Sequence, residues 1–297
     1  MTMLDRHRYE TTSLERRKIF PLLIAGLSGC GLSALANTTT LASLENGANG
    51  RIGLFALCTR SREVLSHRAD ERFLMCSTIK LPIAAAALAR AGRGREALDR
   101  LITFAQGDLV EPHPVTGAHL AEGRLSIMQL CQAAVQESDS TAANLLLTSL
   151  GGPPALADYL RGLGDEVTRS DRLEPELNRR LGELDTTTPR AMARTLQRML
   201  AGPGLAPQFK ASLKLWMHDD LRGVRRLRAG LPTGWSGASK PGTSATCTND
   251  VAILRAPNGQ EFWVAAYCET QPRPLNEREW VLKEVGRHVV DWASRLT

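Results

Sequence analysis

Ser77 and Lys80 are the two residues whose types and spacing most directly suggest chemistry. They stand three positions apart at the start of the alanine- and leucine-rich run 81–88. This run predicts a buried helix with Ser77 in its first turn, so both side chains would project from one helix face. A serine hydroxyl is a weak nucleophile until a neighbouring group takes its proton, and a lysine among apolar neighbours can be that group. Taken alone, the spacing is more typical of an ordinary helix with a surface lysine.

Two further segments carry side chains suited to proton transfer or to holding charge. Ser138-Asp139-Ser140 follows an expected helix, and the hydroxyl of Ser138 could pass a proton to a leaving nitrogen. As an isolated tripeptide it is more typical of a helix cap. Lys240-Pro241-Gly242 lies in an expected strand, where a lysine supplies fixed positive charge and a glycine allows close approach. Neither segment by itself indicates an activity.

The order of these segments along the chain is more informative than any one of them. Ser77-x-x-Lys80, the Ser138 tripeptide and the Lys240 tripeptide follow the order typical of penicillin-binding proteins and class A β-lactamases. A fourth segment, Asp171-Arg172-Leu173-Glu174-Pro175-Glu176-Leu177-Asn178 followed by Asp185, closely resembles the Ω-loop of class A serine β-lactamases. The resemblance extends from about Arg51 to the C-terminus. It implies hydrolysis of the β-lactam amide of penicillins, and of cephalosporins as a further substrate class, without metal or cofactor.

The resemblance assigns the acylation step to particular residues. Ser77 would attack the lactam carbonyl, with the backbone N–H groups of Ser77 and Thr243 as the oxyanion hole. Either Lys80, or Glu174 acting through a bound water, would activate Ser77; both alternatives stay open at this point. Ser138 would protonate the lactam nitrogen.

The resemblance likewise assigns deacylation and substrate binding. Glu174 with Asn178 would hold and activate the water that frees the acyl group. Lys240 would tune Ser138 and attract the substrate carboxylate. Arg172 and Asp185 would form the ion pair that joins the two ends of the Ω-loop; a solvated surface pair of this kind contributes only ~0–1 kcal/mol.

The chain departs from the family pattern at positions that bear on binding. Ser140 stands where asparagine is usual, so contacts to the substrate and to Lys80 are expected to be lost or bridged by water. Pro241 replaces a threonine or serine that binds the substrate carboxylate, and Thr243, two residues beyond Pro241 and therefore on the same strand face, would replace that hydroxyl. Arg226 matches an arginine position used by some members, with a surface arginine as the alternative reading.

Three rival interpretations remain. A D-alanyl-D-alanine peptidase shares the first three segments, but Glu174 and Asn178 argue against it because a peptidase site lacks that base. A covalent β-lactam binder or sensor with slow turnover is kept open by Ser140 and Pro241. A non-catalytic envelope lipoprotein would leave the whole set of polar residues unexplained.

The elements that must position these residues form two groups of strands separated by helices. Strands are predicted at 51–58, 63–67, 237–242, 250–255 and 261–268, helical patterns dominate 77–209, and an amphipathic helix is predicted at 276–294. The simplest arrangement is an α+β fold, a three-layer sandwich, in which one antiparallel sheet of about five strands is built from both chain ends. In the domain 37–297, residues 41–75 and 220–297 would form a sheet lobe, and 76–219 an inserted all-helical lobe.

Composition excludes several classes of partner. The 297 residues carry a formal charge of +6, and the basic residues are spread along the chain rather than clustered with aromatics, of which there are only 14. Nucleic-acid binding is therefore not expected. Neither the six cysteines nor the six histidines fall at metal-ligand spacing, so no metal site is predicted. We expect a monomer acting on a small molecule.

The first 36 residues have the pattern of an export signal. Arg16-Arg17-Lys18 precedes the apolar stretch 19–27, which is too short to span a bilayer. Leu27-Ser28-Gly29-Cys30 resembles a bacterial lipobox, in which Cys30 would be lipidated, whereas Ala34-Leu35-Ala36 fits an ordinary signal-peptidase site. The protein is therefore expected to be exported in a bacterium, and to be periplasmic or attached to the cell envelope.

Overall fold

A five-stranded antiparallel sheet is the central element of the fold. A computed structural model describes residues 41–296 of the chain; the predicted signal peptide and the lipid attachment at Cys30 lie outside the described residues. The strand order is β2-β1-β9-β8-β7. The strands are β1 (Gly50–Cys58), β2 (Val64–His67), β7 (Ser236–Thr243), β8 (Cys247–Arg255) and β9 (Glu261–Thr270). The prediction of one antiparallel sheet built from both chain ends is confirmed.

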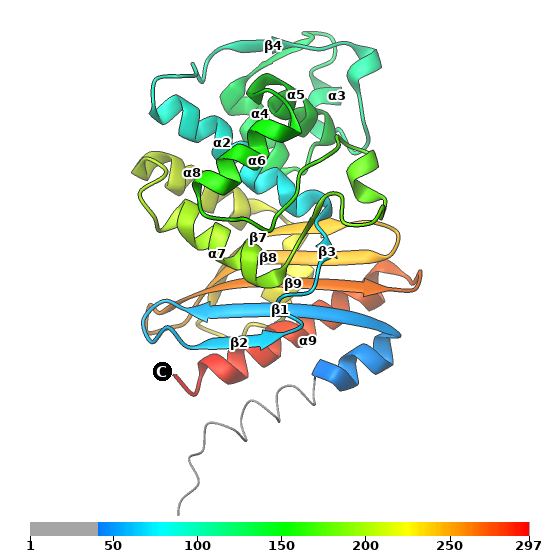
Figure 1. Cartoon of the computed structure of the whole chain (residues 1–297), viewed down its shortest axis with the longest axis vertical. Helices are drawn as coiled ribbons and strands as arrows, with labels where there is room; N and C mark the ends of the chain where they lie inside the picture. The colour runs from blue at the N-terminus through cyan, green and yellow to red at the C-terminus, as the bar shows by residue number, and fades with distance from the viewer. Residues whose placement is uncertain (1–40, 297) are drawn as a thin grey trace, which may run out of the picture.

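The sheet is buried on both faces. Because successive side chains of a strand point to opposite faces, Val251 and Ile253 enter the core beneath the helical part of the chain. Ala252 and Leu254 enter a second core, closed by α9 (Leu275–Ala293). Figure 1 shows the sheet in the lower half of the molecule, with α9 across it and the helices between the two strand groups gathered above. The result is the predicted α+β sandwich.

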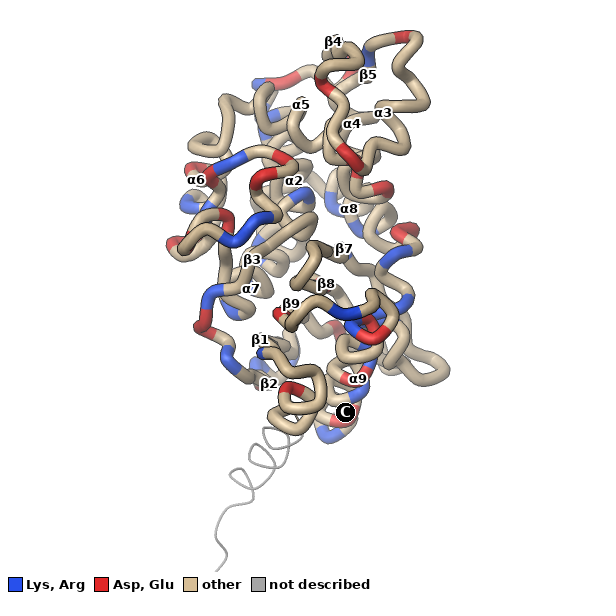
Figure 2. The backbone as a smooth tube through the Cα atoms, turned by 90° about the vertical axis from the view of Figure 1, so that its right-hand side faces the viewer, with Lys and Arg blue, Asp and Glu red and all other residues tan. Residues whose placement is uncertain are grey.

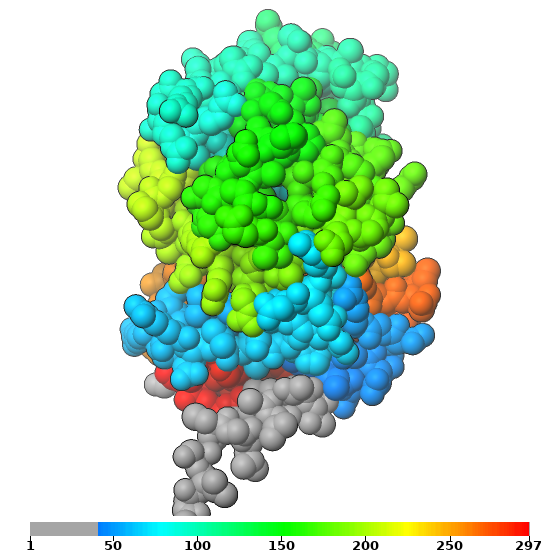
Figure 3. All heavy atoms as spheres, viewed as in Figure 1, coloured from blue at the N-terminus to red at the C-terminus, as the bar shows by residue number. Residues whose placement is uncertain are grey.

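The helices between the two strand groups pack around α2 (Lys80–Gly92), which is buried along most of its length. Its alanine run lets neighbouring helices approach closely. These helices are α3 (Pro114–Ala118), α4 (Ile127–Gln136), α5 (Ser140–Leu150), α6 (Pro153–Gly162), α7 (Pro189–Leu200) and α8 (Pro207–Asp219). In the space-filling view this part of the chain lies directly on the strands (Figure 3).

Two small two-stranded sheets were not predicted. β3 (Phe73–Leu74) pairs with β6 (Thr186–Thr187), and β4 (Leu101–Thr103) pairs with β5 (Arg124–Ser126). Strands of two or three residues are too short to show an alternating pattern. The β3–β6 pair matters for the site, because it brings the chain just before Ser77 next to the end of the predicted Ω-loop.

The division into a sheet lobe and a helical lobe at residues 75/76 and 219/220 stays a prediction.

Figure 2 shows basic and acidic residues interspersed along the backbone of the described chain. Among residues 41–296, none of the helices combines the length and the apolar character needed to cross a membrane.

Candidate active site

A cleft of about 280 Å³ lies where β7, the turn before α2, the start of α5 and the segment 174–178 meet. It is lined by Ser77, Pro112, Ser138, Ser140, Glu174, Asn178, Arg222, Arg225, Arg226, Pro241, Thr243, Leu275 and Glu279. Most of the predicted site residues therefore share one cavity, although they come from segments far apart in the sequence. Lys80, Lys240 and Gly242 lie directly behind its wall.

Ser77 lies in the 3₁₀ turn η1 (Cys76–Ile79), and α2 begins only at Lys80. The prediction that Ser77 occupies the first turn of the α-helix is therefore wrong. The turn is held by the residue that precedes it, because Thr78 donates its N–H (3.3 Å) and its hydroxyl (2.9 Å) to the carbonyl of Met75. Asn249 of β8 also donates to the carbonyls of Leu74 (2.8 Å) and Met75 (3.1 Å). The strand thus fixes the backbone that presents Ser77.

Lys80 is fully buried and surrounded by three oxygen atoms. Its Nζ donates to the carbonyl of Ser138 (2.7 Å) and to the hydroxyl of Ser140 (3.0 Å), and lies 3.1 Å from Oε1 of Glu174. Burial lowers the pKa of Lys80, and the neighbouring Glu174 carboxylate opposes this shift. The expectation that Ser140 loses its contact with Lys80 is wrong, since the shorter side chain reaches Nζ directly.

The tripeptide 138–140 acts as a cap and as part of the cleft wall. Asp139 is the N-cap of α5 and accepts the N–H of Ala142 at 2.8 Å. Its other carboxylate oxygen accepts N–H groups from Val115 and Thr116. Ser138 and Ser140 flank a residue that is held from two elements, so the backbone that carries both hydroxyls is held in place. The alternative reading of this segment as a helix cap is correct for Asp139.

Glu174 is held by a pair of asparagines from two elements. Asn144 of α5 accepts the N–H of Glu174 and donates to its carbonyl, both at 2.9 Å. Asn178 donates through Nδ2 to Oε2 of Glu174, while its Oδ1 is buried without a hydrogen-bond partner among the described residues. A carboxylate and an unpaired amide oxygen therefore lie side by side at the cleft, which suits a water molecule that must be held and deprotonated.

The ends of the Ω-loop are joined by Arg172 and Asp185. Arg172 Nε lies 2.6 Å from Asp185 Oδ2, and Asp185 Oδ1 accepts the backbone N–H groups of Asp171 (2.8 Å) and Arg172 (3.0 Å). Asp185 is fully buried, whereas the Arg172 side chain is 19% exposed. This pair is therefore embedded and hydrogen-bonded, unlike the solvated surface pair given above as its alternative.

Lys240 is paired with a residue that the sequence did not indicate. Its Nζ lies 3.0 Å from Oδ2 of Asp220, and both side chains are fully buried. Burial lowers the pKa of Lys240 to about 8, although Asp220 opposes this shift. The other oxygen of Asp220 accepts from Nε of Arg222 at 2.9 Å, and Arg222 donates to the carbonyls of Gln136 and Glu137. Asp220 and Arg222 lie in a loop without periodicity, so no sequence signal pointed to them.

Arg226 is 2% exposed, so the reading as a surface arginine is wrong. It donates to the carbonyls of Gly242 (2.8 Å) and Asn249 (2.7 Å), and to the hydroxyl of Thr243 (2.6 Å). Glu279 of α9 lies 3.6 Å from Nε of Arg226. A second arginine, Arg225, lies 3.2 Å from the same carboxylate, 67% exposed at the mouth of the cleft.

Gly242 and Pro241 fit the close approach of β7 to the nucleophile turn. A Cβ atom at Gly242 would lie 2.7 Å from the carbonyl oxygen of Met75 and 3.1 Å from the N–H of Thr78. Only glycine avoids that overlap. β7 is an edge strand, as expected from Pro241, which lacks the N–H that an interior strand would need.

Comparisons with known proteins agree with this geometry. The Beta-lactamase enzyme family matches residues 36–293. The chain is 41% identical to β-lactamase L2 of Stenotrophomonas maltophilia over 259 residues, covering 86% of this chain and 85% of that protein. Its structure is similar to that of a β-lactamase from Burkholderia vietnamiensis (TM-score 0.86, 49% identity, 87% of this chain and 97% of the other). It is also similar to a class A β-lactamase described as the last common ancestor of Gram-negative bacteria (0.83, 46%, 86% and 98%).

Proposed function

Because the chain belongs to the β-lactamase family, as a class A serine β-lactamase, we propose how its own side chains divide the steps of β-lactam hydrolysis. The reaction opens the lactam amide and thereby confers antibiotic resistance. Penicillins are the first substrates to test, with cephalosporins next. The assignment of each residue below rests on the contacts of the cleft.

In acylation, Ser77 Oγ bonds to the lactam carbonyl carbon, and the ring C–N bond breaks after Ser138 protonates the nitrogen. The Ser138 carbonyl and the Glu174 carboxylate near Lys80 Nζ are acceptors only and favour an ammonium, so we assign Lys80 its charged form before the reaction. A charged lysine has no lone pair for a proton. We therefore assign the removal of the Ser77 proton to Glu174 acting through a water molecule.

The proton that Glu174 takes from Ser77 replaces the one that Ser138 gives to the lactam nitrogen, so Glu174 is again a carboxylate. In deacylation, this carboxylate activates the water that attacks the acyl carbon. Glu174 Oε2 is bound to Asn178, whose Oδ1 has no partner among the described residues and can accept a hydrogen bond from that water. The carboxylate is 3% exposed, which favours proton transfer over exchange with bulk solvent. This arrangement is the single observation that carries the hydrolytic assignment, because a slow-turnover sensor or a peptidase does not require it.

The substrate carboxylate is assigned to Thr243, Arg226 and Lys240. Arg226 donates to Thr243 Oγ1, so the hydroxyl hydrogen of Thr243 stays free to donate into the cleft. Glu279 offsets part of the positive charge of Arg226. Lys240 adds its positive charge from behind Pro241, which lines the cleft. Thr243 thereby supplies the hydroxyl that Pro241 lacks.

The test is turnover of benzylpenicillin and nitrocefin by wild type, Glu174→Ala and Glu176→Ala. Removing a general base slows its step by ~10²–10⁴-fold. In Glu174→Ala, Lys80 loses the carboxylate that raises its pKa, so the neutral amine can take the Ser77 proton and acylation continues. Deacylation has no such substitute, so a Ser77-linked adduct should accumulate by intact mass. Exposed Glu176 on the same loop is the matched control. Equal trapping by wild type and Glu174→Ala would establish the sensor reading, and loss of penicilloyl product with retained D-Ala-D-Ala cleavage would establish the peptidase reading.

The same proposal places the protein outside the bacterial cytoplasm, as a monomer in the periplasm or anchored by a lipid at Cys30. The support is the basic and apolar pattern of residues 1–36. Fractionation with palmitate labelling of wild type and Cys30→Ser distinguishes lipidation at Cys30 from ordinary signal-peptidase cleavage. Label that disappears in the variant identifies a lipoprotein, and an unlabelled mature chain starting at Asn37 identifies ordinary cleavage.

A further inference from the structure

Two thiols lie next to one another directly behind the nucleophile turn. Cys76 precedes Ser77, and Cys247 is the first residue of β8. With Leu74 they form a small apolar cluster separate from the two main cores, and both are free. They are 0% and 3% exposed, respectively. The hydrolytic assignment uses neither of them.

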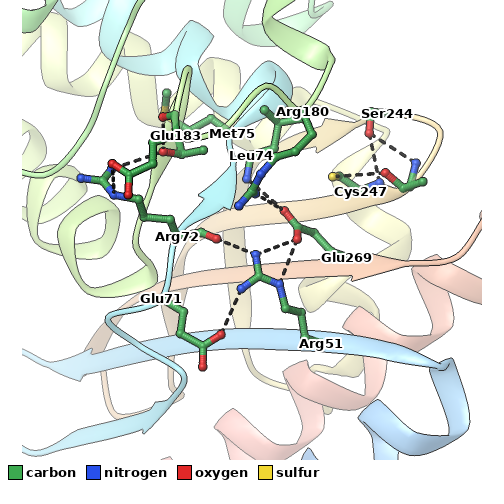
Figure 4. A network of polar contacts seen from close by, with 12 residues as sticks. Arg51, Glu71, Arg72, Leu74, Met75, Arg180, Glu183, Ser244, Cys247 and Glu269 are labelled. Carbon is green, nitrogen blue, oxygen red and sulfur yellow. Dashed lines mark hydrogen bonds and ion pairs between the residues drawn. The ribbon is translucent and has the colours of Figure 1, made fainter.

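Cys247 also lines a second cavity, which shares no residue with the catalytic cleft. This cavity has a volume of about 400 Å³ and is lined by Arg51, Arg180, Cys247 and Glu269 among others. Figure 4 shows Cys247 and Ser244 beside Glu269, which receives Arg51 from one side and Arg180 from the other. Cys247 therefore borders a surface other than the one that receives the substrate.

The charged residues that line this cavity are Arg51, Arg180 and Glu269, which gives a net formal charge of +1. Arg51 donates to Glu269 Oε2 at 2.9 and 2.7 Å, and Arg180 donates to Glu269 Oε1 at 2.8 Å. Arg51 is also paired with Glu71 at 3.0 Å, so Arg180, whose side chain is 45% exposed, is the arginine better placed to meet an entering anion. An anionic group entering the cavity would therefore be attracted toward Cys247.

The two thiols differ in acidity. The hydrogen bond between them lowers the pKa of Cys247, with help from the hydroxyls of Ser244 and Thr246 and against burial. The same hydrogen bond, together with burial, raises the pKa of Cys76. The pair therefore favours the thiolate form at Cys247, with Cys76 as the thiol that donates to it. Since the thiolate is the reactive form, Cys247 is the attacking partner of the pair.

We propose that Cys247 is a thiol-modification site, reached through the Arg51–Arg180 cavity by small anionic disulfides, and that Cys76 resolves the product into an intrachain bridge. In the first step the Cys247 thiolate attacks a disulfide R–S–S–R, giving Cys247–S–S–R and RS⁻. In the second step Cys76–SH attacks the Cys247 sulfur, giving Cys76–S–S–Cys247 and R–SH, with its proton passing to the leaving sulfur. The disulfide reagent is the oxidant and is reduced to two thiols.

The bridge would join the residue before the nucleophile to the strand that already holds the turn. Asn249, two residues along β8 from Cys247, binds the carbonyls of Leu74 and Met75. Gly242 of the neighbouring strand lies against Met75. The bridge would therefore restrain the backbone that presents Ser77, and it would leave the cleft open.

The experiment uses the reduced, full-length chain incubated with oxidised glutathione and read by peptide-mapping mass spectrometry, independently of hydrolysis. Wild type should give a peptide pair bridged through Cys76 and Cys247. Cys76→Ser should stop at Cys247 carrying one glutathionyl group, and Cys268→Ser, which removes a buried cysteine outside the pair, should behave as wild type. Modification of Cys58 or Cys131 ahead of Cys247, or an unreactive Cys247 in a folded chain, would overturn the proposal.

A charge test separates the cavity from general thiol reactivity. In Arg180→Glu the rate with anionic oxidised glutathione, relative to cationic cystamine, should fall about tenfold at low ionic strength, and the difference should shrink at high salt. Arg95→Glu makes the same change of charge at an exposed arginine outside the cavity. If both variants change the ratio equally, the cavity does not guide the reagent and the proposal fails.

Discussion

Ser140 shows how a shorter side chain can keep a contact that a longer one usually makes. Its hydroxyl lies 3.0 Å from Lys80 Nζ, and the neighbouring Ser138 carbonyl lies 2.7 Å from the same atom. Both oxygens come from the segment that Asp139 anchors at the start of α5. The position of Lys80 therefore depends on backbone geometry as much as on the identity of residue 140.

Ser140→Ala should lower kcat/KM for benzylpenicillin by about 10-fold or more, because a hydrogen bond to a charged group contributes ~1.5–3 kcal/mol. Steady-state kinetics measure the effect. Ser212→Ala, which removes an exposed hydroxyl on α8, is the control and should leave kcat/KM unchanged. Wild-type kinetics in Ser140→Ala would show that Ser138 and Glu174 alone suffice to hold Lys80.

Thr243→Val removes the hydroxyl assigned to the substrate carboxylate while keeping the shape of the side chain. Because Thr243 is exposed in the cleft wall, the variant should fold normally. KM for penicillins should rise about tenfold, as for the loss of one hydrogen bond to a charged group, with a smaller change in kcat. Thr246→Val, at the exposed tip between β7 and β8, is the matched control. An unchanged KM would remove Thr243 from the binding site.

At the scale of elements, the Ω-loop is the segment whose order decides whether Glu174 can work. Asp185 ties the two ends of the loop together through one ion pair and two backbone hydrogen bonds. Asn144 then fixes the backbone of Glu174 from α5. The base is therefore placed by contacts at both the ends and the middle of the loop.

Asp185→Asn should loosen this loop, because removing one charge leaves the largely buried Arg172 without its partner. We expect destabilisation of about 3 kcal/mol and accumulation of acyl-enzyme during penicillin turnover. Thermal unfolding and intact-mass analysis measure the two effects. Asp70→Asn also removes the partner of an arginine, but in a pair whose aspartate is 72% exposed, and should change little. Normal deacylation in Asp185→Asn would show that Asn144 alone orders Glu174.

At the scale of the whole molecule, buried charges behind the cleft make stability depend on pH. Burial raises the pKa of Asp250 to about 7 from an ordinary value of 3.8, although Arg226 opposes the shift. Between these two values the folded protein binds more protons at this site than the unfolded chain. The contribution of Asp250 to stability therefore falls as pH rises through this window, and its loss is complete above pH 7.

Asp250→Asn should consequently gain stability relative to wild type as pH rises from 5 to 8. Urea unfolding at both pH values measures the change, and the comparison cancels groups that both proteins share. Asp99→Asn, at an exposed position, is the control and should follow wild type. Parallel pH dependence in wild type and Asp250→Asn would show that Asp250 titrates normally in the folded state.

Local patterns predicted most of the elements. Alternating apolar residues located the strands of the central sheet, although β8 begins three residues before the predicted start at 250. The alanine run located α2, but its first turn was misplaced because a 3₁₀ turn and an α-helical turn share similar residue preferences. The short strands β3 to β6 were missed, since their pairing is decided by distant chain and not by their own residues.

The candidate site residues were selected in the sequence by type, order and spacing, because the proposed reaction requires a hydroxyl, an amine and a carboxylate. Their partners were decided only by the tertiary structure. Asp220 beside Lys240, Asn144 beside Glu174 and Cys247 beside Cys76 join segments separated by 20 to 171 positions. A periodic pattern shows which face of an element is buried, but not which distant element covers it. That choice depends on how the helices pack against both ends of the sheet.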